Sequence, residues 1–463
     1  MKLVYQVKDK PTFAKTLVFA IQQLLAIMTA TLVVPIIINQ NAGLSGDMAM
    51  SPAAALFGAG IGTFVYLLFT KFKSPVFLGS SFAFIGSMTA AFAGATTAAV
   101  GYLGLIIGAI LAGLVYVAIA VAVKFAGVNW LNKLMPPVVI GPTVALIGLS
   151  LAGNAVSDLQ KGGYQIDGVS TASPLLAVLC GLVTLFVVIL CSTFGKRTVK
   201  LIPFIIGILS GYVFALILTL IGMAANLDSM KLISFASFEA LFANGVQITS
   251  FVDFPSFTFI KAFGGFGEFS PEYFVTVLVA YVPVAFVVFA EHVADHKNIS
   301  SIIESDLLEE PGLSRTLLGD GVGSMAGAFF GGCPNTTYGE SVACVAISGN
   351  ASVITIVYTA ALALLVSLLS PFVAFVNSIP SCVMGGVCVA LYGFIAVSGL
   401  KMIQKVNLEE NKNLFVVASI LITGIGGLSL TFGKVTITSI ATALILGIIV
   451  NQTLQLKSKS EEK

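Results

Sequence analysis

The stretch Gly331–Asn350, GGCPNTTYGESVACVAISGN, places backbone breakers and a carboxylate among apolar runs of membrane length. Its glycine pair and Pro334 interrupt a helix, and Asn335–Thr337 are typical of a turn or a helix cap. Helix is expected to resume near Gly339 and to continue for about nine residues, or roughly 14 Å. A hydrocarbon core about 30 Å thick is too wide for such a half-helix to cross. The stretch therefore predicts a broken membrane segment with Glu340 at the start of its half-helix.

A second broken segment, SPVFLGSSFAFIGSMTAAFAGA, begins at Ser74. Its proline and first glycine disfavour helix, and its VFL suits a short strand. Ser80 or Ser81 is expected to cap a helix that runs to about Ala93. Broken backbone at membrane depth is tolerated only where it is buried in protein or lines a wet cavity. Two half-helices that start near mid-membrane would direct free N–H groups at a common point, which suits a small ligand with carbonyl oxygens.

The composition around these segments is that of a multi-pass membrane protein. The chain has 463 residues, of which 57% are hydrophobic and 10% charged, and its mean hydropathy is +1.02. Twelve ordinary apolar spans and the two broken segments predict fourteen crossings. The polar, basic start lacks the apolar core of a signal peptide, so the first run is expected to remain as a helix. The six cysteines are scattered without a C-x-x-C pair, which argues against a zinc site or a disulfide framework.

Basic residues predict the orientation, because cytoplasmic loops collect positive charge. With both termini in the cytoplasm, that side receives all but four of the 23 basic residues. The four exceptions are Lys161, Lys231, Lys261 and Lys434. The basic residues thus mark topology, and no nucleic-acid partner is expected.

The two halves of the chain resemble each other weakly. MPPVVIGPTVALIG from Met135 is similar to IPSCVMGGVCVALYG from Ile379, and GSSFAF from Gly79 aligns with NTTYGE from Asn335. Under the fourteen-crossing topology the halves are inverted, as in many secondary transporters. The segment 226–270 is then the external link between them.

Few ionisable residues interrupt the spans. Glu291 ends a long apolar run, and Glu340 opens a half-helix. A carboxylate at membrane depth must face a cavity, find a partner or stay protonated, so both are predicted to be functional. Asp320, among several glycines, is expected to be a packing or capping acid.

The turn after Glu291 contains both histidines of the chain. Glu291 and Asp295 are adjacent on a helix, and His292 pairs with His296. The His-x-x-x-His spacing could hold a metal, but no third soft ligand is evident, so no metal is expected. An alternative interpretation of His296 and Lys297 is a solvated cytoplasmic helix end, which is favoured for Lys297.

Four motifs resemble the nucleobase–ascorbate transporter family and, within it, the bacterial uracil:proton symporters. They are QQLLAIMTATLVVP from Gln22, LGSSFAF from Leu78, AEHVADH from Ala290 and PNTTYGESVACVAISG from Pro334. The resemblance runs from Thr12 to about Leu456. It implies an all-α membrane fold of fourteen segments in two inverted seven-helix repeats, with short antiparallel strands in broken segments 3 and 10. It also implies a core domain (14–123 and 271–370) and a gate domain (135–225 and 382–455), with substrate bound between them.

The resemblance also implies a binding site. Glu291 and Glu340 match the glutamates that bind the base, and backbone groups at Phe82 and Gly339 match further contacts. Uracil has two N–H donors and two carbonyl acceptors around a flat ring, so carboxylates, half-helix amides and an aromatic ring such as Tyr338 would complement it. The predicted substrate-binding residues are Glu291, Glu340, Phe82, Gly339, Ser81 and Tyr338. The predicted proton-coupling residues are Glu340, Asp295, Glu291 and His296.

The chain departs from the family pattern at several positions near the carboxylates. A glutamine–histidine pair that is common in the first span is Gln22-Gln23 here. Enteric-type uracil symporters have a histidine four residues after the first glutamate, where this chain has Asp295. Three residues around or after Glu340 also differ from the family motif, namely Ser341, Ala343 and Ser348. These changes affect how the carboxylate is held and protonated.

The function predicted from the sequence is proton-driven uptake of uracil across the plasma membrane by alternating access. It requires no cofactor besides the proton gradient, and its partners are the nucleobase and the membrane lipid. The oligomeric state is left open between a monomer and a homodimer. The alternatives are a purine permease for xanthine or urate, whose members tend to have glutamine where Glu340 stands, a membrane-embedded metal enzyme, and a passive channel.

Overall fold

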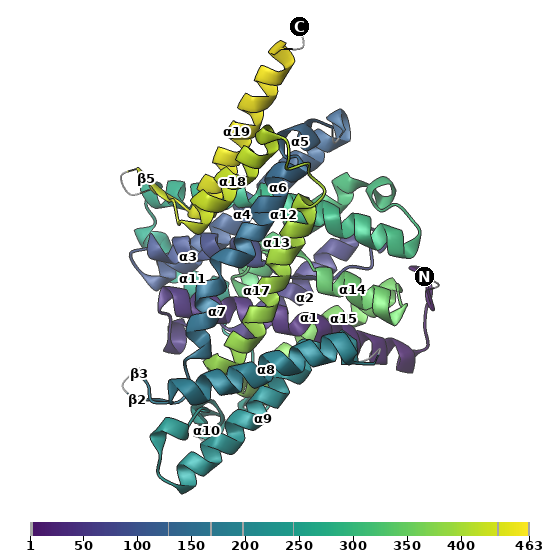
Figure 1. Cartoon of the computed structure of the whole chain (residues 1–463). Coiled ribbons are helices and arrows are strands. Elements are labelled where there is room, and N and C mark those ends of the chain that lie inside the picture. Colours follow the sequence, from purple (N-terminus) through teal and green to yellow (C-terminus); the bar gives the residue numbers. More distant parts are fainter. Residues whose placement is uncertain are drawn as a thin grey trace.

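The computed structural model describes residues 3–127, 129–166, 169–196, 199–243, 245–432 and 435–461. Helices dominate these ranges, and α17 passes through the middle of the molecule (Figure 1). The hairpin of α8 and α9 lies at one end, and the C-terminal helix α19 projects from the other (Figure 1). Four basic residues used to predict the orientation lie outside the described residues, namely Lys2, Arg197, Lys434 and Lys463.

The first half of the chain forms the following helices and strands: α1 (Phe13–Ala42), α2 (Pro52–Phe69), β1 (Leu78–Ser80), α3 (Ile85–Ala93), α4 (Ala98–Ala126), α5 (Asn129–Leu134), α6 (Pro137–Ser150), α7 (Ala152–Leu159), β2 (Gln165–Ile166), β3 (Val169–Ser170), α8 (Pro174–Phe194) and α9 (Pro203–Ala224). The link to the second half contains two short helices, α10 (Ala236–Phe242) and α11 (Thr258–Ala262).

The second half follows the same order: α12 (Pro271–Ile303), α13 (Leu313–Gly331), β4 (Asn335–Thr337), α14 (Gly339–Ser348), α15 (Val353–Ser367), α16 (Ser370–Ser378), α17 (Ser381–Ile403), α18 (Asn411–Ile425), β5 (Leu430–Phe432), β6 (Val435–Ile437) and α19 (Ser439–Glu461). Within the described residues, eight helices are long and apolar enough to cross a membrane. The shorter apolar helices include α14 and α15. The total of fourteen crossings stays a prediction.

Proline and serine define how two of these helices begin. Pro52 and Pro271 occupy the first turns of α2 and α12, where a missing N–H costs nothing and the fixed φ suits a helix. Each follows a serine whose hydroxyl accepts a free backbone N–H. Ser51 Oγ lies 3.2 Å from the nitrogen of Ala54, and Ser270 caps α12 in the same way.

The two broken segments pair with each other. Strands β1 and β4 are antiparallel, with Leu78 opposite Thr337 and Ser80 opposite Asn335, and every residue of both strands is buried. This pairing confirms the short antiparallel strands that the resemblance implies in the two broken segments, whereas the interpretation of 335–337 as a turn or cap was wrong. The expected VFL strand also lies two residues too early, since only its leucine belongs to β1. Each strand satisfies the backbone groups of the other, which the hydrocarbon core could not do.

A half-helix follows each strand. The 3₁₀ turn η2 (Phe82–Phe84) leads from β1 into α3, which ends at Ala93 as predicted. Ser81 precedes η2, but its side chain makes no capping hydrogen bond, so the expected serine cap is wrong at this residue. After β4, α14 spans Gly339–Ser348, which confirms the predicted start of the second half-helix.

The remaining helices pack in two sets. In one set, α13 packs on α2 and α4, α12 on α4, and α15 on α1 and α2. In the other, α17 packs on α6, α7 and α8, and α18 packs on α6 and α19. The α2–α13 crossing is close because small residues meet there: a Cβ on Gly62 would lie 2.7 Å from the carbonyl oxygen of Gly323. The core and gate boundaries assigned from the sequence stay a prediction.

Candidate functional site

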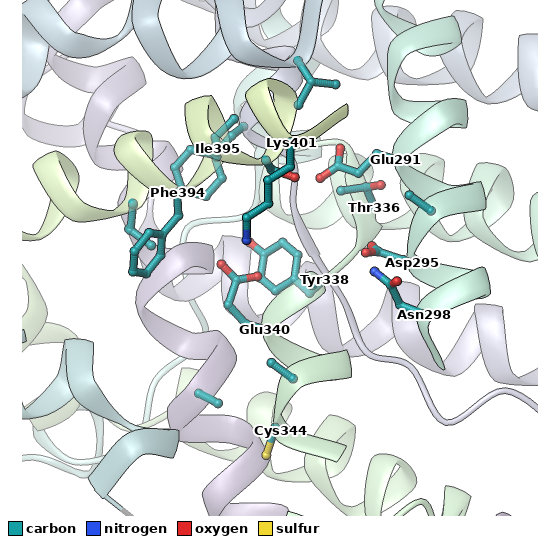
Figure 2. Close-up of a pocket in the computed structure, with 18 of the residues that line it drawn as sticks. Glu291, Asp295, Asn298, Thr336, Tyr338, Glu340, Cys344, Phe394, Ile395 and Lys401 are labelled. Atoms are coloured by element: carbon teal, nitrogen blue, oxygen red, sulfur yellow. The ribbon is translucent and has the colours of Figure 1, made fainter. Parts of the chain in front are cut away.

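A cavity of about 750 Å³ lies between the two sets of helices. One wall comes from η2, α12, β4 and α14, and the opposite wall comes from α6 and α17. Figure 2 shows Glu291, Asp295 and Asn298 on one side, Phe394 with Ile395 on the other, and Tyr338 and Glu340 between them. The volume is within the range of about 300–1,000 Å³ that small-molecule sites occupy.

Glu340 is the second residue of α14 and lines this cavity. The residue before the helix, Tyr338, gives no side-chain cap, so the N–H groups of the first turn are left for another acceptor. A half-helix that starts in this way offers free amides and the positive end of its dipole beside the carboxylate. Oxygen atoms of a ligand can therefore be bound by the same turn that supplies an acceptor for its N–H groups.

Tyr338 is held against β1. Its hydroxyl donates to the carbonyl oxygen of Ser80 at 2.7 Å, and its ring is almost fully buried. The ring occupies the space that a side chain at position 79 would need, because a Cβ on Gly79 would clash with it. Gly79 is thus required for the ring to lie over the strand pair and border the cavity.

Phe82 belongs to the opposite half-helix and brings its ring to the same cavity. The ring meets Tyr392 of α17 edge to face, with ring centroids 6.2 Å apart. The starts of both half-helices therefore border one cavity, as the sequence predicted. Ser81 is buried beside Phe82 but does not line the cavity.

Helix α12 contributes Glu291 and Asp295, one turn apart, to the cavity. Asp295 Oδ2 accepts a hydrogen bond of 2.8 Å from Thr337 Oγ1, which ties α12 to β4. No hydrogen bond or ion pair from another described residue reaches the carboxylate of Glu291 or Glu340. Both oxygen atoms of these two carboxylates therefore remain available to a ligand, whereas Asp295 has one oxygen atom, Oδ1, without a hydrogen bond from the described residues.

The two histidines, His292 and His296, do not line the cavity. His292 Nδ1 lies 2.7 Å from Asp320 Oδ2, and His296 Nε2 lies 2.7 Å from the hydroxyl of Tyr66. The two imidazole rings stack with centroids 4.0 Å apart, as the i, i+4 spacing predicted. The interpretation of His296 as a solvated helix end was wrong, because α12 continues to Ile303 and the side chain is fully buried. Lys297, in contrast, is exposed.

Thr336 was not predicted as a site residue. It lines the cavity, and its buried hydroxyl has no hydrogen-bond partner among the described residues. Its neighbour Thr337 points the other way, to Asp295. Alternation along a strand explains this division, so the strand that the resemblance implies in this segment was the signal that could have assigned the two threonines to opposite faces. In the part of the chain that the structure describes, no group of three or more His, Cys, Asp or Glu residues could hold a metal.

Comparison with known proteins connects this geometry to a family. The family model Xan_ur_permease, described as Permease family, matches residues 14–432. A uracil permease of Bacillus caldolyticus is 34% identical over 465 residues, which cover all of this chain and 97% of the relative. The uracil permease of Bacillus subtilis is 35% identical and covers 98% of this chain and 96% of its own length. That of Escherichia coli K12 is 32% identical over 96% of this chain and 92% of its own length.

Solved structures show the same fold at much lower identity. The transmembrane domain of a cyanobacterium bicarbonate transporter, BicA, is similar with a TM-score of 0.60 at 15% identity, covering 96% of this chain and 99% of that domain. Murine Slc26a9, an anion transporter in the inward-facing state, gives a TM-score of 0.62 at 10% identity, covering 97% of this chain and 69% of its own. These likenesses support the inverted-repeat membrane fold and nothing finer.

The two threonines of β4 give a matched test of this geometry. We expect Thr337→Val to lower the free energy of unfolding by about 1–3 kcal/mol, because the buried Asp295 carboxylate loses its donor. Thr336→Val should leave stability unchanged or higher, since that hydroxyl has no partner to lose. Thermal unfolding of both variants in detergent measures the difference. A larger loss for Thr336→Val than for Thr337→Val would contradict the strand orientation described above.

Proposed function

Because the chain belongs to the nucleobase–ascorbate transporter family, we propose that it carries uracil into the cell together with protons. Membership of this permease family makes the protein a multi-pass membrane transporter and not an enzyme. The observation that carries the proposal for uracil is the pair of carboxylates, Glu291 and Glu340, that face one cavity without a partner from another described residue.

The chemistry of the cavity suits a pyrimidine. Uracil presents alternating N–H donors and carbonyl acceptors along its edge, and both of its faces are apolar. The carboxylates of Glu291 and Glu340 can accept the N–H groups, while the free amides at the start of α14 can donate to a carbonyl oxygen. The rings of Phe82 and Tyr338 border the same space and can cover the base. Thr336 adds one hydroxyl without a partner among the described residues.

The names of the relatives favour the same substrate. The proteins of Bacillus caldolyticus, Bacillus subtilis and Escherichia coli that match nearly the whole chain are all uracil permeases. Glu340 also supports a pyrimidine over xanthine or urate, since the purine branch of the resemblance tends to have glutamine at this position.

The rim of the cavity indicates which side it opens to. Lys200, Lys401 and Lys405 line it, and all three belong to the set that the charge distribution assigns to the cytoplasm. The Lys401 side chain points into the cavity (Figure 2). We therefore interpret the conformation as inward-facing, the one from which substrate and proton leave. The proposal includes location in the plasma membrane with both termini in the cytoplasm.

Proton coupling follows from the same acids. Glu291, Asp295 and Glu340 share one cavity at membrane depth, where a carboxylate must contact water, find a partner or carry a proton. Binding of the base changes the partners of these acids, so substrate and proton can favour the same conformational state. We propose Glu340, Glu291 and Asp295 as the coupling residues. His296 lies behind the cavity, so its predicted part would be indirect, through the helix it shares with Glu291.

Substitution of each glutamate tests the site. We expect Glu340→Gln and Glu291→Gln each to weaken uracil binding about 10- to 100-fold, because a hydrogen bond to a charged group contributes about 1.5–3 kcal/mol. Radiolabelled uracil uptake and equilibrium binding in detergent measure the effect, and Glu409→Gln, at an exposed carboxylate, is the matched control. Unchanged binding in both variants would remove the site assignment. Uptake that excess xanthine suppresses and excess uracil does not would remove the substrate assignment.

Proteoliposomes test the coupling. With the exterior more acidic by one pH unit, we expect about tenfold accumulation of uracil if one proton accompanies each base, because a tenfold concentration ratio and one pH unit store the same free energy. Reversing the gradient should drive uracil out, and a protonophore should abolish accumulation while leaving exchange intact. Uracil that only equilibrates, with or without the protonophore, would identify a passive channel or uniporter.

A further inference from the structure

The hydroxyl of Ser341 connects three segments that are far apart in the sequence. It accepts a hydrogen bond of 2.5 Å from Gln23 Nε2 of α1 and one of 3.0 Å from the backbone N–H of Phe77, just before β1. Gln23 Nε2 also lies 3.3 Å from the carbonyl oxygen of Ser341. Ser341 is fully buried and Gln23 almost so, and neither lines the cavity. Their polar groups therefore contact protein and not substrate.

The backbone of Phe77 makes one hydrogen bond to the residue after Glu340 and one to a residue before it. Its N–H donates to Ser341 Oγ, and its carbonyl oxygen accepts a hydrogen bond of 3.2 Å from the N–H of Tyr338. Tyr338 and Ser341 flank the pair Gly339–Glu340 in the chain. The start of α14 is thus fixed at two points to one residue of the other broken segment, and Gln23 adds a third point from α1.

The two side chains in this contact are also two of the positions at which the sequence departs from the family pattern. Gln23 stands where the resemblance leads one to expect histidine, and Ser341 stands where it leads one to expect asparagine. The structure brings both departures together at 2.5 Å. Ser341 is shorter than the expected asparagine, and the long side-chain amide of Gln23 reaches its hydroxyl from α1. The two departures therefore form one contact and are not independent changes.

We propose that Gln23 and Ser341 act as one positioning unit for Glu340 and thereby set the affinity of the site for its base. This inference rests on the proposed uptake of uracil. Neither residue touches the substrate; together they fix the first turn of α14, and with it the carboxylate and the free amides that face the cavity. Loss of the Ser341 hydroxyl leaves the Gln23 amide and the Phe77 N–H without their shared acceptor, so the turn can shift.

A double-mutant cycle on the full-length protein tests the unit. We expect Ser341→Ala and Gln23→Leu each to raise the Kd and the KM for uracil about tenfold, with a much smaller change in Vmax. The double variant should stay near tenfold, because the second substitution removes a contact that is already lost. Two independent residues would instead give about a hundredfold. Binding of uracil is measured in detergent, and uptake in proteoliposomes.

Thr219→Ala is the matched control. The Thr219 hydroxyl is buried and also accepts two backbone N–H groups, from Leu232 and Ile233, each at 3.0 Å. It lies in α9, which packs on α8 and α17, and it does not line the cavity. We expect this variant to lower the thermal unfolding temperature and to leave the Kd for uracil unchanged. A change in Kd equal to that of Ser341→Ala would mean that general destabilisation explains both, and would overturn the inference.

The remaining outcomes separate this inference from the function on which it rests. Wild-type protein that binds uracil while both single variants bind it equally well would overturn the inference alone. Multiplicative effects in the double variant would overturn the coupling of the two residues. Wild-type protein that binds no uracil would overturn the proposed function and the inference with it. Gln23→Leu leaves the bond between Phe77 and Ser341 in place, so it keeps the test decisive should Ser341→Ala not fold.

Discussion

The pairing of β1 with β4 is the interaction on which the rest of this structure depends. Two segments break helix inside a membrane protein, and their free N–H and C=O groups would each cost several kcal/mol in hydrocarbon. The strands satisfy one another over Leu78–Ser80 and Asn335–Thr337. Backbone bonds at both ends extend the pairing, from the Ser81 N–H to the carbonyl oxygen of Pro334 and from the Tyr338 N–H to that of Phe77. Each broken segment is stable only because the other breaks at the matching place.

The site follows from this pairing. Because the strands are antiparallel, the half-helices leave the ladder at its two ends, and the first turn of each borders the same cavity. The bond between Thr337 and Asp295 then places α12, and with it Glu291, against the ladder. The opposite wall comes from α6 and α17, in the other set of helices. A ligand in the cavity can therefore contact both sets, which is the arrangement that alternating access between two moving parts requires.

Much of this architecture could be predicted from local sequence. Proline, glycine and a half-helix too short for the bilayer locate the breaks, and rare carboxylates in apolar runs point to Glu291 and Glu340. Local composition alone does not predict the strand at 335–337, because three polar residues after a proline have the composition of a turn and the partner strand lies some 250 residues away in the chain; only the family resemblance implied it. The burial of His296 was missed for a similar reason, since it depends on Tyr66 of α2. The contact between Gln23 and Ser341 joins two helices that no local pattern connects.

The central claim is that the first turns of both half-helices bind the base, and hydrogen–deuterium exchange of the purified protein with and without uracil tests it most directly. Free amides that face an open cavity exchange quickly, and amides that donate to a bound carbonyl oxygen exchange slowly. We expect saturating uracil to slow exchange in peptides that contain Phe82–Ile85 and Gly339–Val342, while peptides from α10 and α16, which do not line the cavity, are unaffected. Uracil that binds and protects other segments, with no change in these two, would contradict it.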